Sequence, residues 1–332
     1  MSGGEVGMSR DEELPADLNL AWSDPQLDTA VRALARRDPQ PALDVLAATR
    51  DDADRRELAV EVLAVAGQHA LADLQTFAEE RTADADRWLL LGGSFAAAAW
   101  TARGADVAER TSLDQFEGLA SFAEQSRAAL HHATELAPQD PVPWSELLRC
   151  AVGALDHDGE LDEIFAQVQK LGPDLYAANQ ARLGGLTRKW YGSQEQALAF
   201  ARQRTERLPA GHPLLALVAA AHIEGLLDGL MRGTVIGRMW RHLRYLANTQ
   251  VRAEVDGASD RLLGGGDRYD SHPRTMAAHQ MFAAFYRQAD DTERARPHLE
   301  RGGCRPMPWP WGYFGEYAEE FAAAREAAGL AG

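Results

Sequence analysis

The sequence predicts an all-α fold, a right-handed stack of antiparallel helical hairpins, on three observations. Leucine-bearing segments close with a proline at Pro138, Pro173 and Pro209, at intervals of 35 and 36 residues. Apolar residues recur every three or four positions, as on one face of a helix, and no segment alternates as a strand would. A period of about 34 to 40 residues is typical of stacked hairpins, because one hairpin cannot bury its apolar face alone.

Composition limits the classes of protein that the chain can belong to. Its 332 residues are 45% hydrophobic and carry a formal net charge of −16. We expect a disordered leader over residues 1–20, which lack periodic apolar spacing, and a single helical repeat domain over residues 21–332. The acidic charge argues against a nucleic-acid partner, since phosphate binding needs a concentrated positive surface.

The sequence also predicts a cytoplasmic protein without a membrane span. The longest apolar stretch, residues 213–221, is shorter than the roughly 20 residues that cross a bilayer. The N-terminus is acidic, unlike a secretion signal. Cys150 and Cys304 lie in no CxxC or histidine-rich spacing, so neither a disulfide framework nor a zinc site is expected.

The first helices begin at recognisable signals. Asp24 precedes Pro25 at the start of an apolar stripe, Pro41 starts a second helix, and Asp54 is expected to cap a third. A longer hairpin is expected over residues 86–138. The acidic run that contains Asp54 is better explained by helix capping than by a magnesium cluster.

Two adjacent units, residues 139–173 and 174–209, follow the period best. In the first, Trp144 and Leu147 keep the spacing of the tetratricopeptide pattern W-x2-L-G-x2-Y, although other residues replace its Gly and Tyr. The second places its small residues and Pro209 close to the repeat's landmarks. These units resemble tetratricopeptide repeats, and the resemblance implies a divergent solenoid.

The string that runs from Lys189-Trp190 through Gly192-Ser193 is the most distinctive in the chain. It resembles the Lys-Trp-x-Gly-Ser signature of an uncharacterised bacterial family of tetratricopeptide-like proteins. That family has no known activity, so the resemblance implies no catalytic residue. From the residues themselves, we expect Trp190 to end one helix, Gly192 to permit a turn, and Ser193 to cap the next helix with Gln196 three residues on.

Beyond Pro209 the period fades. We expect a helix over residues 213–231 and a second over residues 238–255. Three glycines at 264–266 lack the Lys-Ser or Lys-Thr of a phosphate-binding loop and indicate a flexible connection. An atypical C-terminal cap is expected over residues 267–332, with an aromatic segment at 309–314 packed over the end of the stack.

The charge reverses within residues 171–250, which contain ten Lys or Arg against five Asp or Glu. Arginines interleaved with aromatics fit a concave surface that binds an acidic or carboxylate-ended peptide, although the simpler explanation is a solvated helix face beside acidic neighbours. The candidate groove residues are Arg188, Lys189, Trp190, Glu224, Asp228, Trp240, Arg241, Arg244 and Tyr245.

Neither catalytic residues, a metal nor a cofactor are predicted. Glu224, Asp228 and Arg232 recur every four residues on an apolar helix, which favours an ion-paired stripe over a paired-carboxylate active site. The ten histidines show no convergent ligand spacing.

The leading hypothesis is a non-enzymatic scaffold whose concave face, residues 176–245, binds a protein or peptide. The alternative is a small-molecule-binding protein or an enzyme of bacterial specialised metabolism, with a pocket around His222, Glu224, Asp228, Trp240 and Tyr245. A third possibility is an accessory subunit that stabilises a partner enzyme. The sequence specifies no oligomeric state.

Overall fold

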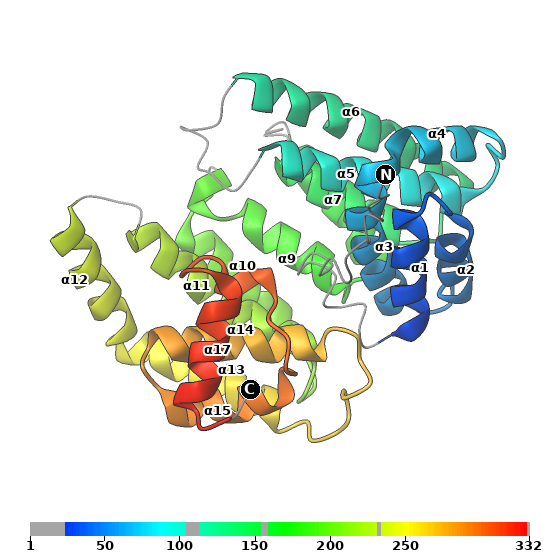
Figure 1. The fold of residues 1–332 in the computed structure, drawn as a ribbon. Coiled ribbons are helices and arrows are strands. Elements are labelled where there is room, and N and C mark those ends of the chain that lie inside the picture. Colours follow the sequence, from blue (N-terminus) through cyan, green and yellow to red (C-terminus); the bar gives the residue numbers. More distant parts are fainter. Residues whose placement is uncertain (1–23, 104–112, 154–158, 191, 231–233, 331–332) are drawn as a thin grey trace, which may run out of the picture.

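The computed structural model describes residues 24–103, 113–153, 159–190, 192–230 and 234–330, and every regular element in these ranges is a helix (Figure 1). The all-α prediction is therefore confirmed. The predicted leader over residues 1–20 lies outside the described residues, as do Arg232 and the middle of the turn that joins the two helices of the 139–173 unit.

The N-terminal half forms one group of helices (Figure 1). Asp24 caps the first by accepting hydrogen bonds from two backbone amides, as the sequence predicted. Asp52, and not Asp54, caps the third through the amide of Arg55, so Asp54 lies inside the first turn. The helices are α1 (Pro25–Ala35), α2 (Gln40–Ala48), α3 (Ala53–Gly67), the 3-10 turn η2 (Gln68–Ala70), α4 (Leu71–Glu79), α5 (Ala85–Arg103), α6 (Leu113–Leu136), α7 (Val142–Gly153) and α8 (Glu160–Leu171).

The second half contains the predicted C-terminal hairpin and closing helix. One prediction is wrong: the single helix over residues 238–255 is two helices, because the Asn248 side chain accepts from the amide of Gln250 and starts a new one. The elements are α9 (Tyr176–Gly185), η4 (Arg188–Trp190), α10 (Gln194–Thr205), η5 (Pro213–Leu215), α11 (Ala216–Leu230), α12 (Val235–Leu246), α13 (Thr249–Leu263), α14 (Thr275–Gln288), α15 (Thr292–Arg301), α16 (Pro308–Trp311) and α17 (Tyr317–Ala327).

The turn between α9 and α10 follows the predicted chemistry with one difference. The hydroxyl of Ser193 accepts from the amide of Gln196 at 3.2 Å, which confirms the cap. A Cβ on Gly192 would lie 2.0 Å from the carbonyl oxygen of Leu186, so glycine is required there. Trp190 does not end the first helix, because α9 stops at Gly185 and Trp190 belongs to η4.

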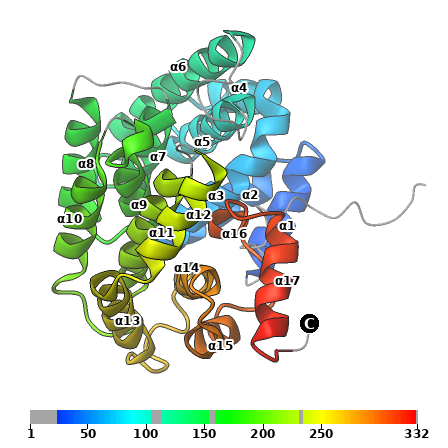
Figure 2. The ribbon, with the colours of Figure 1, turned by 90° about the vertical axis from the view of Figure 1, so that its left-hand side faces the viewer.

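Two apolar cores divide the chain. The first is built by residues from α1 to the start of α9, and the second by residues from α9 to the C-terminus. Met307 packs against both cores. At the centre of the second core, the 18-residue stretch Pro213–Leu230 is long and apolar enough to cross a membrane, but 72% of it is buried against other helices. Figure 2 shows the two halves on either side of α9 and α11.

Candidate ligand-binding cavity

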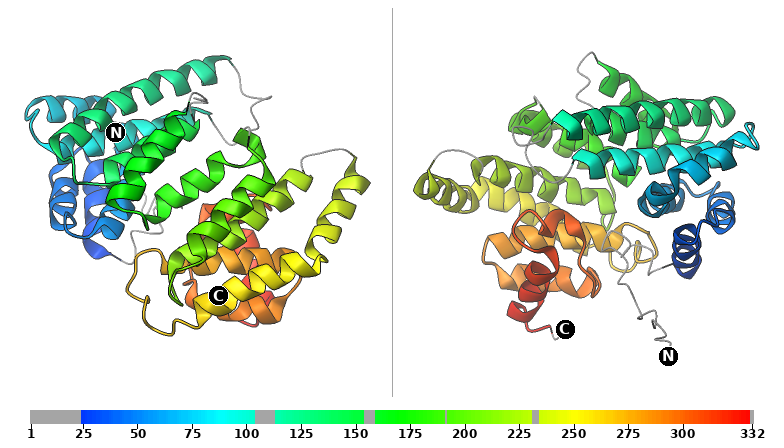
Figure 3. Two further views of the ribbon diagram at one scale, coloured as in Figure 1. Left: turned by 180° about the vertical axis from the view of Figure 1, so that it is seen from behind. Right: turned by 45° about the horizontal axis from the view of Figure 1, so that its top comes forward.

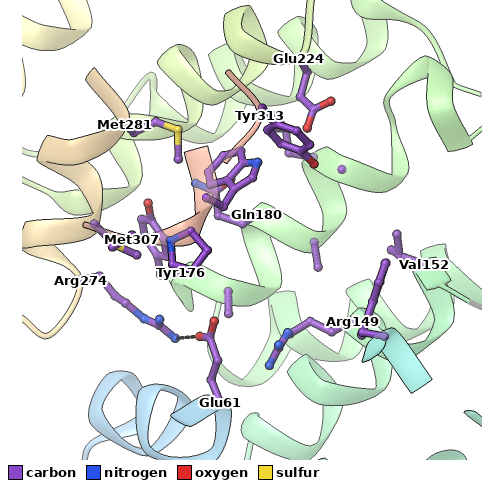
Figure 4. A pocket seen from close by; sticks show the side chains of 18 of the residues that line it. Glu61, Arg149, Val152, Tyr176, Gln180, Glu224, Arg274, Met281, Met307 and Tyr313 are labelled. Carbon is purple, nitrogen blue, oxygen red and sulfur yellow. Dashed lines mark ion pairs between the residues drawn. The ribbon is translucent and has the colours of Figure 1, made fainter. Parts of the chain in front are cut away.

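A cavity of about 440 Å³ lies where the two cores meet. It is lined by residues of α3, α5 and α7 from the first half, of α9 and η4, and of α11, α14 and the α16 segment from the second. This volume is in the range of sites for small organic molecules, and such sites are common between packed units. Figure 4 shows the side chains that surround it.

Helix α9 forms one wall, and a carboxylate from another helix fixes its position. Leu175 stands at the N-cap of α9 and provides no side-chain acceptor. The fully buried Glu57 of α3 takes this role, because its oxygens accept from the amides of Ala177 at 2.8 Å and Ala178 at 3.0 Å. The Ser145 hydroxyl of α7 donates to the same carboxylate at 2.6 Å. Glu57 therefore ties three helices together beside the cavity.

The upper walls are largely aromatic. Trp100 of α5 and Trp190 of η4 meet edge to face with ring centroids 6.1 Å apart. Trp309 and Tyr313 form a second edge-to-face pair at 6.5 Å. Such surfaces bind planar or apolar groups through dispersion and burial of area. Met281 and Met307 complete these walls with side chains that adapt to irregular shapes.

The floor is polar and carries paired charges. A guanidinium nitrogen of Arg274 lies 2.7 Å from the Glu61 carboxylate and 3.3 Å from that of Glu57. Arg149 donates to both oxygens of Glu146 at 2.8 and 3.0 Å. Figure 4 shows Glu61 between the two arginines. Because each arginine has a carboxylate partner, the floor has little surplus charge.

Burial and the two arginines shift the pKa values of the carboxyl groups in the floor in opposite directions. Burial acts against the charged form of Glu61, but Arg274 and Arg149 outweigh it and lower the pKa of this carboxyl. Burial dominates at Glu146 and raises the pKa of its carboxyl despite Arg149. Burial also raises the pKa of Tyr176 to about 12, so its hydroxyl stays neutral. Glu61 thus favours its charged form beside the two arginines, whereas burial favours the neutral form of Glu146.

Several polar atoms on the lining residues have no hydrogen-bond partner within the described part of the chain. They are the hydroxyl of Tyr176, the amide nitrogen of Gln180 and Nε of Arg274. A buried donor without a partner costs about 1–3 kcal/mol. All three can donate, so they fit a ligand that supplies acceptor oxygens.

Lys189, Glu224 and Tyr313 meet at one end of the cavity. The ammonium of Lys189 lies 2.7 Å from the Glu224 carboxylate and 3.2 Å from the Tyr313 hydroxyl. Burial disfavours the charged lysine, yet Glu224 and Tyr313 outweigh it and raise the pKa of Lys189. Lys189 and Tyr313 are partly exposed, whereas Glu224 is buried. The three side chains therefore bridge η4, α11 and the C-terminal aromatic segment at the cavity's edge.

The structure brings three of the predicted groove residues together at this cavity: Lys189, Trp190 and Glu224. It places the other six elsewhere. Arg188 is exposed on η4 and Asp228 is partly buried on α11, while four residues lie on α12: Trp240, Arg241, Arg244 and Tyr245.

Around His222, where the sequence suggested an alternative pocket, the structure places a second polar cluster. The Tyr245 hydroxyl lies 2.8 Å from Nδ1 of His222 and accepts from Gln194 at 3.3 Å. Nε2 of His222 is 3.4 Å from Glu254. The bond from Arg202, followed by that from His222, lowers the pKa of Glu254 to about 2. Glu224 faces the cavity instead, and Trp240 faces solvent.

Sequence reasoning missed the floor of the cavity. Glu57 and Glu61 lie four residues apart on α3, where they interrupt an apolar helix, and Arg149 interrupts the apolar run of α7. A charged residue at a core position was the available signal. No group of three or more potential metal-ligating side chains occurs in the described ranges. No protein-family model matches the chain, and the search of curated proteins found no match.

Proposed function

We propose that the protein binds a small, uncharged organic molecule in the cavity between its two halves. The observation that carries this proposal is the combination of aromatic walls with a charge-balanced polar floor. The walls favour a planar or compact apolar body, and the floor favours a carbonyl or hydroxyl oxygen at one end.

The charges support an uncharged ligand. An anion needs surplus positive charge and a cation needs surplus negative charge, and the floor offers little of either because carboxyl groups face both of its arginines. An acceptor oxygen can satisfy the unpartnered donors of Tyr176, Gln180 and Arg274. The proposal is binding and not nucleophilic chemistry, because Glu224 keeps the amine of Lys189 protonated.

Two helical glycines provide the test. A Cβ built on Gly184, which lines the cavity, meets no atom within 4 Å, so Gly184→Leu places a side chain in the open space. Gly257 of α13 is matched to it, since its Cβ also meets nothing within 4 Å, but it lies away from this cavity. Each substitution replaces a helical glycine and raises stability by roughly 0.5–1 kcal/mol.

The neutral planar dye Nile red serves as the probe, with binding followed by fluorescence. We expect wild type and Gly257→Leu to bind it with similar affinity and Gly184→Leu to bind it at least about 10-fold more weakly, because one or two lost apolar contacts correspond to roughly 1.4 kcal/mol. Equal binding by all three proteins would refute the proposal. A small molecule that copurifies with wild type and is absent from Gly184→Leu, detected by native mass spectrometry, would identify the ligand.

Two predictions from the sequence, the repeat architecture and the peptide-binding scaffold, are also proposals. We also propose that the units at 139–173 and 174–209 form part of a right-handed, tetratricopeptide-like stack, and the proposed binding does not depend on that relationship. A peptide-binding scaffold centred on residues 176–245 is the competing function. We favour the small molecule because Lys189, Trp190 and Glu224 lie at the cavity, whereas Trp240 and Arg244 lie on α12.

A further inference from the structure

Helix α12 is oriented with its apolar face towards solvent. Five apolar side chains share one face, at relative positions i, i+1, i+4, i+5 and i+8. They are among the most exposed large apolar residues described: Val235 (72%), Ile236 (66%), Met239 (55%), Trp240 (68%) and Leu243 (55%). A surface helix of a globular protein ordinarily turns such a stripe towards the core.

Polar contacts hold α12 to the rest of the protein. Tyr245 is bonded to His222 and Gln194, and Nε of Arg241 donates to the carbonyl of Gly229 at 3.1 Å. In Figure 1 the helix projects at the side of the molecule, and in Figure 2 it crosses the face nearest the viewer. The view from behind in Figure 3 again places this helix at the outer edge. The apolar stripe is therefore open to a broad surface.

Basic residues border the apolar stripe on both sides. At about 100° per residue, Arg244 lies roughly 40° beyond Trp240, and Arg238 lies roughly 60° beyond Val235 at the opposite edge. Residues 235–246 contain no Asp or Glu. Neither Arg238 nor Arg244 has an ion pair within the described part of the chain. Whatever covers this helix must offer apolar contact at its centre and negative charge at its borders.

We propose that α12 binds the surface of an anionic membrane. A helix that lies in the headgroup region buries its apolar face among acyl chains while flanking arginines contact lipid phosphates, and tryptophan favours this boundary. The protein's net charge of −16 opposes this approach only weakly, because charges farther than about 8 Å are screened at physiological ionic strength.

A second copy of the chain fits this face less well. Two α12 helices packed about a twofold axis would bring arginines from both copies together, with no carboxylate from either helix to balance them. A single partner helix would cover only part of the stripe, which extends over about 140° of the circumference. A lipid surface contacts all five apolar side chains and both arginines at once.

Co-sedimentation of the full chain with vesicles tests this proposal. We expect wild type to bind vesicles of equal parts phosphatidylglycerol and phosphatidylcholine, to bind pure phosphatidylcholine much more weakly, and to dissociate at high salt. The double variant Arg238→Gln/Arg244→Gln is expected to bind anionic vesicles about 30-fold more weakly, since each arginine contributes about 5-fold. The exposed Arg207→Gln, on the connection after α10, is the charge-matched control and keeps wild-type binding.

Met239→Glu tests the apolar face, because the exposed carboxylate does not disturb folding but cannot enter the lipid. Loss of sedimentation in this variant, with an unchanged circular dichroism spectrum, supports the proposal. Wild type that stays in solution with anionic vesicles at low salt would overturn it, as would a Met239→Glu protein that binds like wild type. A wild-type dimer dissociated by Met239→Glu, seen by sedimentation velocity, would also overturn it and identify the face as a protein interface.

Discussion

A buried pair of histidines in the second core makes the stability of this protein sensitive to mild acid. Nδ1 of His279 lies 2.8 Å from Nδ1 of His298, whose other ring nitrogen is 2.7 Å from the Ser259 hydroxyl. Both rings are almost fully buried. Burial, followed by Arg301, lowers the pKa of His279 from 6.5 to about 4. Burial, followed by His279, moves the pKa of His298 in the same direction.

The sign of the effect follows from proton binding. Between pH 6.5 and 4 the unfolded chain protonates His279 and the folded protein does not, so the free energy of unfolding falls as the pH falls through this window. Linkage with these two pKa values gives a loss of about 2 kcal/mol between pH 7 and pH 5 from His279 alone. The contribution of His279 is largely constant below pH 4.

The assay is urea unfolding, followed by circular dichroism, at both pH values. His279→Asn keeps an amide near the position of Nδ1 but cannot titrate, so we expect its stability to fall by about 2 kcal/mol less than that of wild type. The exposed His69→Asn is the control and should lose as much as wild type. Carboxylates titrate alike in all three proteins and cancel in the comparison. Equal losses in wild type and His279→Asn would refute the reasoning.

Three further predictions concern the cavity and its supports. Glu57→Gln should lower the free energy of unfolding by about 3 kcal/mol in urea titrations, because Arg274 loses one carboxylate partner and the N-terminus of α9 loses its charged acceptor. A change below about 1 kcal/mol would count against this role of Glu57. Ser193→Ala should lower the free energy of unfolding by about 1 kcal/mol in the same assay. Ser193→Asp keeps a side-chain acceptor for the helix cap, so it should change this free energy little. Glu224→Gln should lower the pKa of Lys189, because burial then acts with less opposition. Acylation of Lys189 near pH 9, measured by mass spectrometry against Lys170, the only other lysine, should rise; an unchanged ratio contradicts the assigned cause.

Local signals in the sequence predicted the helices well because caps and turns depend on neighbouring residues. Ser193 and Gly192 are such cases, since the contacts that require them lie within about seven residues. The break at Asn248 was missed because the apolar pattern continues across it, although the residue itself is a common N-cap.

The cavity could be predicted only in part. Lys189 and Trp190 stood out as an unusual string, and Glu224 as a charge on an apolar helix. Their meeting with Tyr313 depends on how segments far apart in sequence pack, which no local pattern encodes. Glu61 likewise pairs with Arg274, which is far along the chain, and no local pattern encodes that contact.

The contacts of Glu57 have a consequence for synthesis on the ribosome. Its hydroxyl partner on α7, its amide partners on α9 and its guanidinium partner at the N-cap of α14 lie 88, 120 to 121 and 217 residues further along the chain. At about 5–20 residues per second, the last of these emerges some 10 to 40 s after Glu57. During that interval the N-terminal half contains Glu57 but not Arg274. Water must therefore solvate the Glu57 carboxylate until Arg274 has been synthesised. A chain released before Arg274 is made should therefore expose the junction between the two halves.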